Sequence, residues 1–133
     1  MLRVVLDTNV LVSAVVSDGK PRKLFMKGLE NKFSIVTSDL LLAEFARVVR
    51  RSKFRTSAQE IRRMTIALRS SAEVISVKTR FSVVKDDPED DVVIETAYDG
   101  HADFIVTGDN HLLALRRFRG IEIISVEKLF DML

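Results

Sequence analysis

The chain has no cysteine, only two prolines and five glycines among its 133 residues, and no long apolar run. The absence of cysteine excludes a disulfide framework, a thiolate zinc site and a cysteine nucleophile, and it is consistent with a reducing compartment. The first apolar stretch reaches Asp7 too early to form a signal peptide, and no later stretch approaches the length of a membrane span. We therefore expect a soluble, cytoplasmic protein with no membrane contact.

The composition predicts one compact domain over residues 1–133. Hydrophobic residues make up 47% of the chain, charged residues make up 30%, and no low-complexity segment suggests a linker. The net charge is only +2, from 21 basic and 19 acidic residues. The basic residues nevertheless gather in three places: Arg47, Arg50, Arg51, Lys53 and Arg55; Arg62 and Arg63; and Arg116, Arg117 and Arg119. Each cluster is compatible either with phosphate contacts or with a solvated helix face.

Short apolar segments typical of strands alternate along the chain with segments of helical spacing. The strands are expected at 3–6, 33–36, 74–77, 104–106 and 121–124, and the helices at 10–16, 24–29, 40–51, 57–72, 87–98, just after 109, and at 126–132. This alternation predicts an α/β fold with a parallel sheet covered on both faces, because parallel neighbours need crossovers that pack helices on the sheet.

Two acidic residues stand directly after predicted strands. Asp7 follows the first strand, and Asp109 follows the strand at 104–106. Ligands of such sheets bind beyond the carboxyl ends of the strands, so both acids are expected on the functional edge. The competing interpretation is structural: Asp7 would be a turn residue capping the next helix, and Asp109 would be a helix N-cap.

Glu44 interrupts an apolar helical segment and shares helical spacing with Leu40, Leu41 and Val48. We expect its carboxylate to face inward, where it needs a counter-charge or a metal ion, because burial of an unpaired carboxylate costs several kcal/mol. A pair with Arg47, three residues further on, is the structural alternative.

The segment 86–91 is acidic at five of its six positions and starts a helix, with Asp87 as the N-cap. Capping does not require so many acids. Helical phase places Asp90 in line with Ile94 and Ala97, whereas Asp91 lines up with Glu95 and Tyr98, so we choose Asp90 as the functional acid. Asp87 and Asp91 remain open alternatives.

Carboxylates that meet at one sheet edge repel each other unless divalent cations neutralise them. Oxygen ligands suit Mg²⁺ or Mn²⁺, which bind substrate phosphates directly. The pattern therefore predicts metal-assisted hydrolysis of a phosphodiester bond, which needs no serine, histidine or cysteine nucleophile.

Four segments resemble the PIN-domain ribonucleases in order and spacing. They lie at 4–11, 38–44, 87–91 and 105–109. The resemblance covers nearly the whole chain, and it is greatest to the stand-alone PIN proteins of toxin–antitoxin systems, related to the VapC toxins.

The resemblance implies a three-layer α/β/α sandwich on a parallel sheet. It matches the four acids of the family to Asp7, Glu44, Asp90 and Asp109, which would bind Mg²⁺ or Mn²⁺ and catalyse endonucleolytic cleavage of RNA. It also implies a homodimer and, for a toxin, an antitoxin partner. Polar residues beside the metals, orienting the acids, would be Asn9, Ser38 and Thr107, together with Asp91.

Other enzyme classes fit less well. A phosphatase of the haloacid-dehalogenase type needs an acid two residues after the first, where this chain has Asn9. A response-regulator receiver needs a lysine that Thr107-Gly108-Asp109 does not provide, and a dinucleotide site needs a glycine-rich turn after the first strand. The remaining alternative is a non-catalytic PIN-like module that binds RNA or protein through its arginines.

Overall fold

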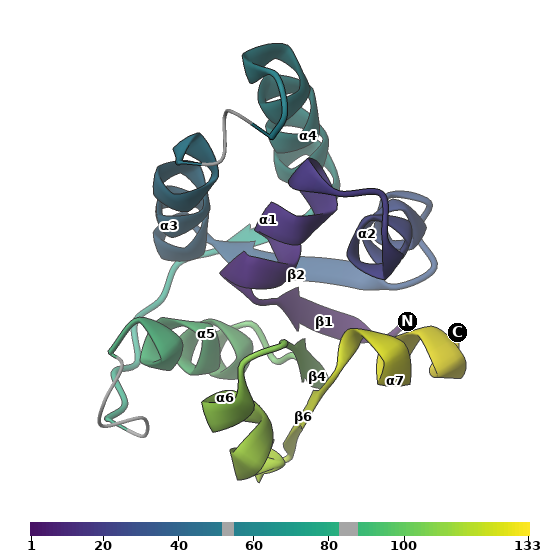
Figure 1. Ribbon diagram of the computed structural model, residues 1–133. Coiled ribbons are helices and arrows are strands. Elements are labelled where there is room, and N and C mark those ends of the chain that lie inside the picture. The colour runs from purple at the N-terminus through teal and green to yellow at the C-terminus, as the bar shows by residue number, and fades with distance from the viewer. Residues whose placement is uncertain (52–54, 83–87) are drawn as a thin grey trace.

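The computed structural model describes residues 1–51, 55–82 and 88–133, and within the helix that begins at Pro88 it describes the side chains from Asp91 onward. In chain order the elements are β1 (Arg3–Leu6), α1 (Thr8–Val16), α2 (Lys20–Leu29), β2 (Ser34–Ser38), α3 (Asp39–Arg50), α4 (Ala58–Ser71), β3 (Glu73–Ile75), α5 (Pro88–Asp99), β4 (Phe104–Val106), α6 (Asn110–Leu115), β5 (Arg117–Phe118), β6 (Ile121–Ile124) and α7 (Val126–Met132). Figure 1 shows the strands in the middle of the molecule, with helices on both sides.

Within the described part of the chain, the sheet has the strand order β3-β2-β1-β4-β6-β5. Neighbouring strands run parallel except at the β5–β6 pair, which is an antiparallel hairpin. The parallel sheet expected from the sequence is therefore correct for β1, β2, β3, β4 and β6, whereas β5 was not predicted. A strand of two residues is too short to produce a hydrophobic alternation.

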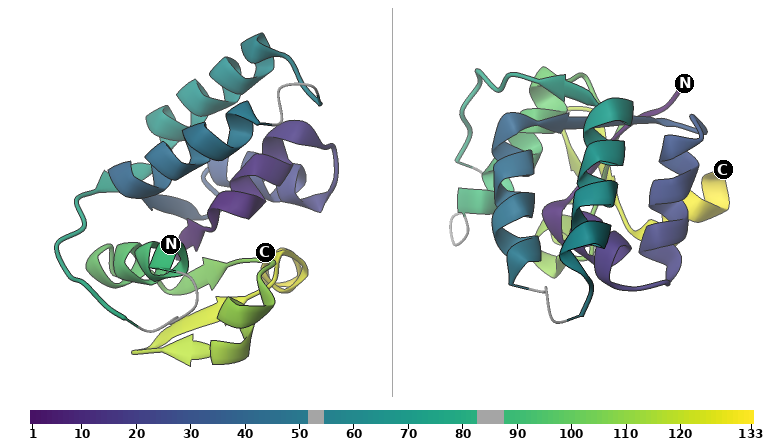
Figure 2. Two further views of the ribbon diagram at one scale, coloured as in Figure 1. Left: turned by 60° about the vertical axis from the view of Figure 1, so that its left-hand side comes forward. Right: turned by 90° about the horizontal axis from the view of Figure 1, so that it is seen from above.

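Residues on successive positions of β1 point to opposite faces of the sheet, and each face has its own core. Val4 and Leu6 pack with side chains of α1, α2, α3, α4 and α7, whereas Val5 packs with side chains of α5 and α6. The two views of Figure 2 show these helix layers from the side and from above. The structure thus confirms the three-layer α/β/α architecture, in which β1 lies inside the sheet between β2 and β4.

Serine residues fix the start of two helices, α3 and α4. The Ser38 hydroxyl accepts a hydrogen bond from Leu41 N over 3.2 Å at the start of α3, and the Ser57 hydroxyl accepts one from Glu60 N over 3.0 Å at the start of α4. Both caps follow from the preference of serine for the N-cap position. The helices expected at 40–51 and 57–72 are therefore confirmed to within one residue at their amino ends.

The helices are short by the standards of membrane proteins. The longest helix in the described part of the chain, α4, has 14 residues, whereas a span needs about 20 apolar residues. Among the described residues, no helix combines the length and the apolar character needed to cross a membrane.

Candidate active site

The carboxyl ends of three adjacent strands form the edge of the sheet that the sequence predicts to be functional. β1 lies between β2 and β4, with Val5 opposite Val36 on one side and Leu6 opposite Val106 on the other. Asp7 N continues the ladder by donating to Val106 O over 2.9 Å. Asp7 and Thr107, which follow β1 and β4, and Ser38, the last residue of β2, therefore lie at one edge.

Asp7 occupies the N-cap position of α1 but does not cap the helix. Its backbone is extended, and its side chain makes no capping hydrogen bond. Only 5% of the residue is exposed. Its Oδ2 atom instead accepts a hydrogen bond from the Thr107 hydroxyl over 2.7 Å. Helix capping therefore does not account for an acid at this position, although aspartate is a preferred N-cap residue.

Thr107 links Asp7 to Asp109. The Thr107 hydroxyl is fully buried, and its oxygen accepts a hydrogen bond from Asp109 N over 3.0 Å. Asp109 is the N-cap of α6, and its Oδ1 atom accepts a hydrogen bond from His111 N over 2.8 Å. Asp109 therefore does cap α6, as the structural interpretation proposed, but the cap uses only its Oδ1 atom. Among the described residues, Oδ2 of Asp109 has no hydrogen-bond partner.

Glu44 lies on α3 at the border between its buried and exposed faces. Leu41, Leu42 and Phe45 are buried, whereas Ala43 is exposed and Glu44 is half-buried. The expectation that Glu44 faces the interior is therefore only partly met. The reason is that Leu40, used to define the inward stripe, is itself 43% exposed, so the buried face of α3 is rotated away from it.

The two sides of α5 do not separate the candidates for the third acid by burial. Asp91 and Glu95, expected on the outer side of α5, are only 7% and 4% exposed. Glu95 is covered because residues 78–81 lie along α5: Phe81 N donates to Glu95 Oε2 over 2.8 Å. The side chain of Asp90 and the whole of Asp87 lie outside the described residues, so Asp90 remains a prediction.

A buried pair of hydroxyl groups that the sequence did not suggest joins α5 to the edge of the sheet. Ser38 Oγ and Thr96 Oγ1 are 2.9 Å apart, and both residues have no exposed surface. Because Ser38 also caps α3, this pair fixes α5 relative to the helix that contains Glu44. In the sequence, the sign of this pair was Thr96 itself: a polar residue in the apolar stretch of a buried helix needs a hydrogen-bond partner.

The donor set at this edge consists of hard oxygen atoms. Thr8 and Thr37 add hydroxyl oxygens that are buried without a hydrogen-bond partner in the described part of the chain. Oxygen donors of this kind match the preference of Mg²⁺ and Mn²⁺. Among the described side chains, however, no three Asp, Glu or His residues are close enough to hold one ion.

A cleft of about 340 Å³ opens beside Thr107. Asn9 and Ser13 of α1 line one side of it, and Gly108 and Ser125 line another. Asn9, expected beside the metals, is exposed and lines this cleft, so it does not belong to the buried network around Asp7. Asp7 is not among the residues that line this cleft, and it is connected to the cleft through the hydrogen bond from Thr107.

Comparisons with known proteins agree with this geometry. The family model described as "PIN domain" matches residues 3–111. The uncharacterised protein MJ1680 of Methanocaldococcus jannaschii is 33% identical over 119 residues, which are 86% of this chain and 76% of that protein.

Two solved structures have the same fold at low identity. PAE2754 from Pyrobaculum aerophilum has a TM-score of 0.68 at 18% identity, with 98% of this chain and 88% of that chain covered. VapBC2 from Rickettsia felis, solved with a DNA fragment from its promoter, has a TM-score of 0.64 at 19% identity, with 93% and 98% covered.

Proposed function

Because the chain belongs to the PIN-domain family, whose members are generally nucleases, we propose that it is an endoribonuclease dependent on Mg²⁺ or Mn²⁺. The observation that supports this most is the state of Asp7. It is nearly buried at the carboxyl end of the central strand, at a helix N-cap that it does not cap, and a buried hydroxyl orients it. Burial of a carboxylate is costly, so a functional use of its charge explains its position.

The proposed ligands are Asp7, Glu44, Asp90 and Asp109, shared between one or two ions, with Asp91 beside them. The bound ion would activate a water molecule for attack on the phosphodiester and stabilise the leaving oxygen. Asp109 fits this role because the capping bond to His111 N engages only Oδ1.

The neighbouring polar residues would keep the acids in place. Thr107 holds Asp7 through its hydroxyl and receives the N–H of Asp109, so it sets the relation between two of the proposed ligands. Ser38 and Thr96 hold α5 against α3 in the same way. Such outer contacts matter for metal sites because they fix the orientation of the ligands.

We further propose that the protein is the toxin of a toxin–antitoxin pair and a homodimer. The likeness to the VapBC2 chain supports the first point at the level of the fold. Co-expression with the small open reading frame next to this one tests it: a product that co-purifies and suppresses cleavage supports it, and a failure of both contradicts it. A monomeric mass in light scattering would refute the dimer.

The nuclease proposal is tested with end-labelled, pooled RNA incubated with Mn²⁺, Mg²⁺ or EDTA. We expect products with a divalent ion and none with EDTA. Asp7→Asn and Asp90→Asn should both abolish cleavage and leave the melting temperature intact or raised. For Asp7 the reason is that removing a buried charge relieves its desolvation cost. Asp131→Asn, a change at an exposed acid of α7, is the matched control and should cleave like the wild type.

Cleavage that survives EDTA or both substitutions would refute the proposal. Salt-sensitive RNA binding without products in any divalent ion would instead identify a non-catalytic binding module. The exposed arginines of α3 and α4, which include Arg50, Arg62 and Arg63, favour that second candidate.

A further inference from the structure

The arginine cluster at 116–119 lies far from the proposed nuclease site. Arg117 belongs to β5, and Arg119 with Gly120 forms the turn between β5 and β6. β6 runs parallel to β4, so the turn before it lies at the amino edge of the sheet. Asp7 follows β1 at the carboxyl edge. The proposed nuclease site therefore does not account for this cluster.

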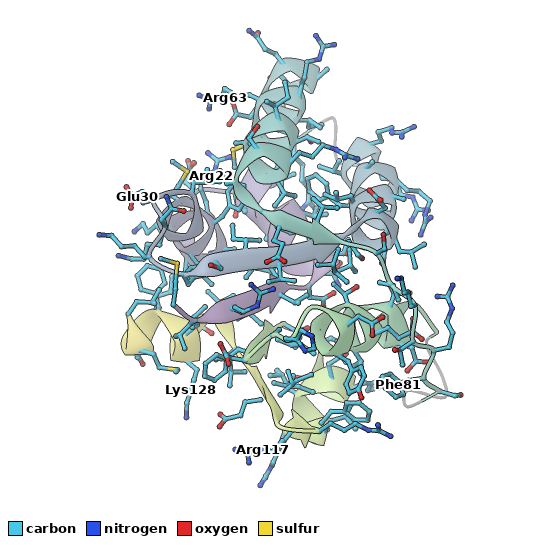
Figure 3. All side chains as sticks on the ribbon, turned by 180° about the vertical axis from the view of Figure 1, so that it is seen from behind. Arg22, Glu30, Arg63, Phe81, Arg117 and Lys128 are labelled. Atoms are coloured by element: carbon cyan, nitrogen blue, oxygen red, sulfur yellow. The ribbon has the colours of Figure 1, made fainter. Side chains whose placement is uncertain are left out.

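Arg119 lies against three aromatic rings from different parts of the chain. Its guanidinium carbon is 5.1 Å from the ring centre of Phe81, 5.6 Å from that of Tyr98 and 5.5 Å from that of Phe118. Phe81 meets Tyr98 and Phe118 edge-to-face, with ring centres 5.2 and 5.0 Å apart. Figure 3 shows Phe81 near the hairpin that contains Arg117. The rings hold the guanidinium in place at the surface.

A pocket of about 460 Å³ adjoins this cluster, with Arg119, Tyr98, Asp99 and His101 in its lining. Sites for small molecules usually have volumes of about 300–1,000 Å³. Arg119 and His101 are exposed, and Tyr98 is 37% exposed. The pocket therefore combines an aromatic surface with a cation that solvent can reach.

Asp99 is the acidic residue in the pocket lining, and its carboxylate already accepts hydrogen bonds from residues 78 and 79. Its oxygens accept hydrogen bonds from Lys78 N at 2.7 Å, Thr79 N at 2.9 Å and the Thr79 hydroxyl at 2.6 Å. These donors stabilise the charged form of Asp99 and occupy its oxygens. The pocket lining therefore holds both a carboxylate and the Arg119 guanidinium, and the guanidinium is the group that can pair with an anion.

The backbone around the pocket is in an uncommon conformation. His101 has φ 52° and Arg119 has φ 47°, while Gly120 has φ 84°. The left-handed region is unfavourable for most residues with a side chain, although histidine is found there more often than most. Arg116, which is outside the pocket lining, also has φ 60°, so this conformation does not by itself mark the pocket as functional.

We propose that this pocket binds a nucleotide unit, either free or within a single RNA strand. The base packs against Tyr98 and the plane of the guanidinium, and the phosphate pairs with the N–H groups at the guanidinium edge. Aromatic and arginine planes are the usual stacking surfaces for unpaired bases. Binding needs neither a divalent ion nor Asp7, so it is independent of the nuclease proposal.

The sequence provides a specific probe for the test, because Tyr98 is the only tyrosine of the chain. Protein labelled with ring-¹³C tyrosine gives one set of ring signals, which is followed by NMR in EDTA during titration with AMP, penta-adenylate or inorganic phosphate. We expect saturable shifts with AMP or penta-adenylate and none with phosphate. Tighter binding of penta-adenylate identifies a single strand as the ligand, and equal binding identifies a free nucleotide.

Two variants and one control test whether the nucleotide binds in this pocket. Arg119→Lys keeps the charge but removes the planar group, so binding should weaken at least about tenfold. His101→Ala, which leaves the ring cluster untouched, should also weaken it. Arg116→Lys makes the same chemical change at an exposed neighbour outside the pocket lining and should leave binding unchanged. The proposal fails if Tyr98 does not respond at millimolar nucleotide, if phosphate alone gives the same shifts, or if the Arg119 and His101 variants both bind like the wild type.

Discussion

The Thr107 hydroxyl donates a hydrogen bond to Asp7 Oδ2 over 2.7 Å, and the same oxygen accepts Asp109 N over 3.0 Å. One buried side chain therefore sets the orientation of an acid after β1 and the position of an acid after β4. The pairing of the two strands brings these residues together, because Leu6 lies opposite Val106. Loss of this hydroxyl should affect metal binding at the proposed site, and it should also lower stability, because it leaves a buried carboxylate oxygen without this donor.

Thr107→Val removes the hydroxyl and keeps the shape of the side chain. We expect a loss of about 10–100-fold in cleavage and in Mn²⁺ affinity, the usual effect of removing a group that orients metal ligands. Thr107→Ser keeps the hydroxyl and is the matched control, so it should retain most of the activity. Isothermal titration with Mn²⁺ and the gel assay measure both effects. Equal activity in the two variants would contradict an orienting role.

The positions of Asp7 and Asp109 could be predicted because strand ends and parallel topology are visible in a local hydrophobic pattern. The choice of Asp90 as the third acid stays a prediction, but the reasoning behind it was incomplete. The choice of Asp90 over Asp91 assumed that one side of α5 faces solvent, whereas residues 78–81 cover that side through the hydrogen bond from Phe81 N to Glu95. A segment without regular structure leaves no periodic signal, so the burial of Asp91 and Glu95 was not foreseen.

Ser38 and Ser57 both cap a helix, but only Ser38 also has a buried partner. Ser57→Ala removes a cap alone and should lower the free energy of unfolding by about 1 kcal/mol. Ser38→Ala should cost about 2–4 kcal/mol, because it also leaves the buried Thr96 hydroxyl unsatisfied. Urea titration measures both values.

The combination of Ser38→Ala with Thr96→Val separates the two contributions. Replacing both partners removes the unsatisfied hydroxyl, so the double variant should be less destabilised than the sum of the single variants. Strict additivity would show that the 2.9 Å contact contributes nothing to stability.

Asp99 links stability to pH. Its pKa lies below the ordinary value of 3.8, chiefly because the Thr79 hydroxyl and the backbone N–H of Thr79 donate hydrogen bonds to its charged form. A carboxylate with a lowered folded-state pKa stabilises the fold above the unfolded-state pKa, and this contribution is lost as the pH falls through the folded-state value. The stabilisation is therefore fully present at neutral pH and disappears below about pH 4.

Asp99→Asn should accordingly be less stable than the wild type at pH 7, and the difference between their melting temperatures should shrink on acidification below about pH 4. Asp131→Asn, at an exposed acid, should follow the wild type throughout. Melting curves between pH 7 and pH 2.5 provide the comparison. A constant difference between Asp99→Asn and the wild type would show that the hydrogen bonds from Thr79 do not favour the charged form.

Gly100 and Gly108 follow α5 and β4, and the structure assigns them different roles. A Cβ atom on Gly100 would lie 2.6 Å from Val36 Cγ1 and 2.9 Å from the backbone oxygen of Thr96, whereas a Cβ atom on Gly108 would meet nothing within 4 Å. The backbone oxygen cannot move without disturbing the last turn of α5. Gly100 thus allows α5 to lie close against β2.

Gly100→Ala should therefore lower the free energy of unfolding by about 1–3 kcal/mol through overpacking. Gly108→Ala is the matched control, and it should be neutral or stabilising by up to about 1 kcal/mol, because it restricts the unfolded chain without a clash. Urea titration compares the two. Since Gly108 lines the cleft beside Thr107, cleavage by Gly108→Ala should also be measured: reduced cleavage at unchanged stability would mean that substrate approaches the backbone there, and a loss of stability equal to that of Gly100→Ala would contradict the packing argument.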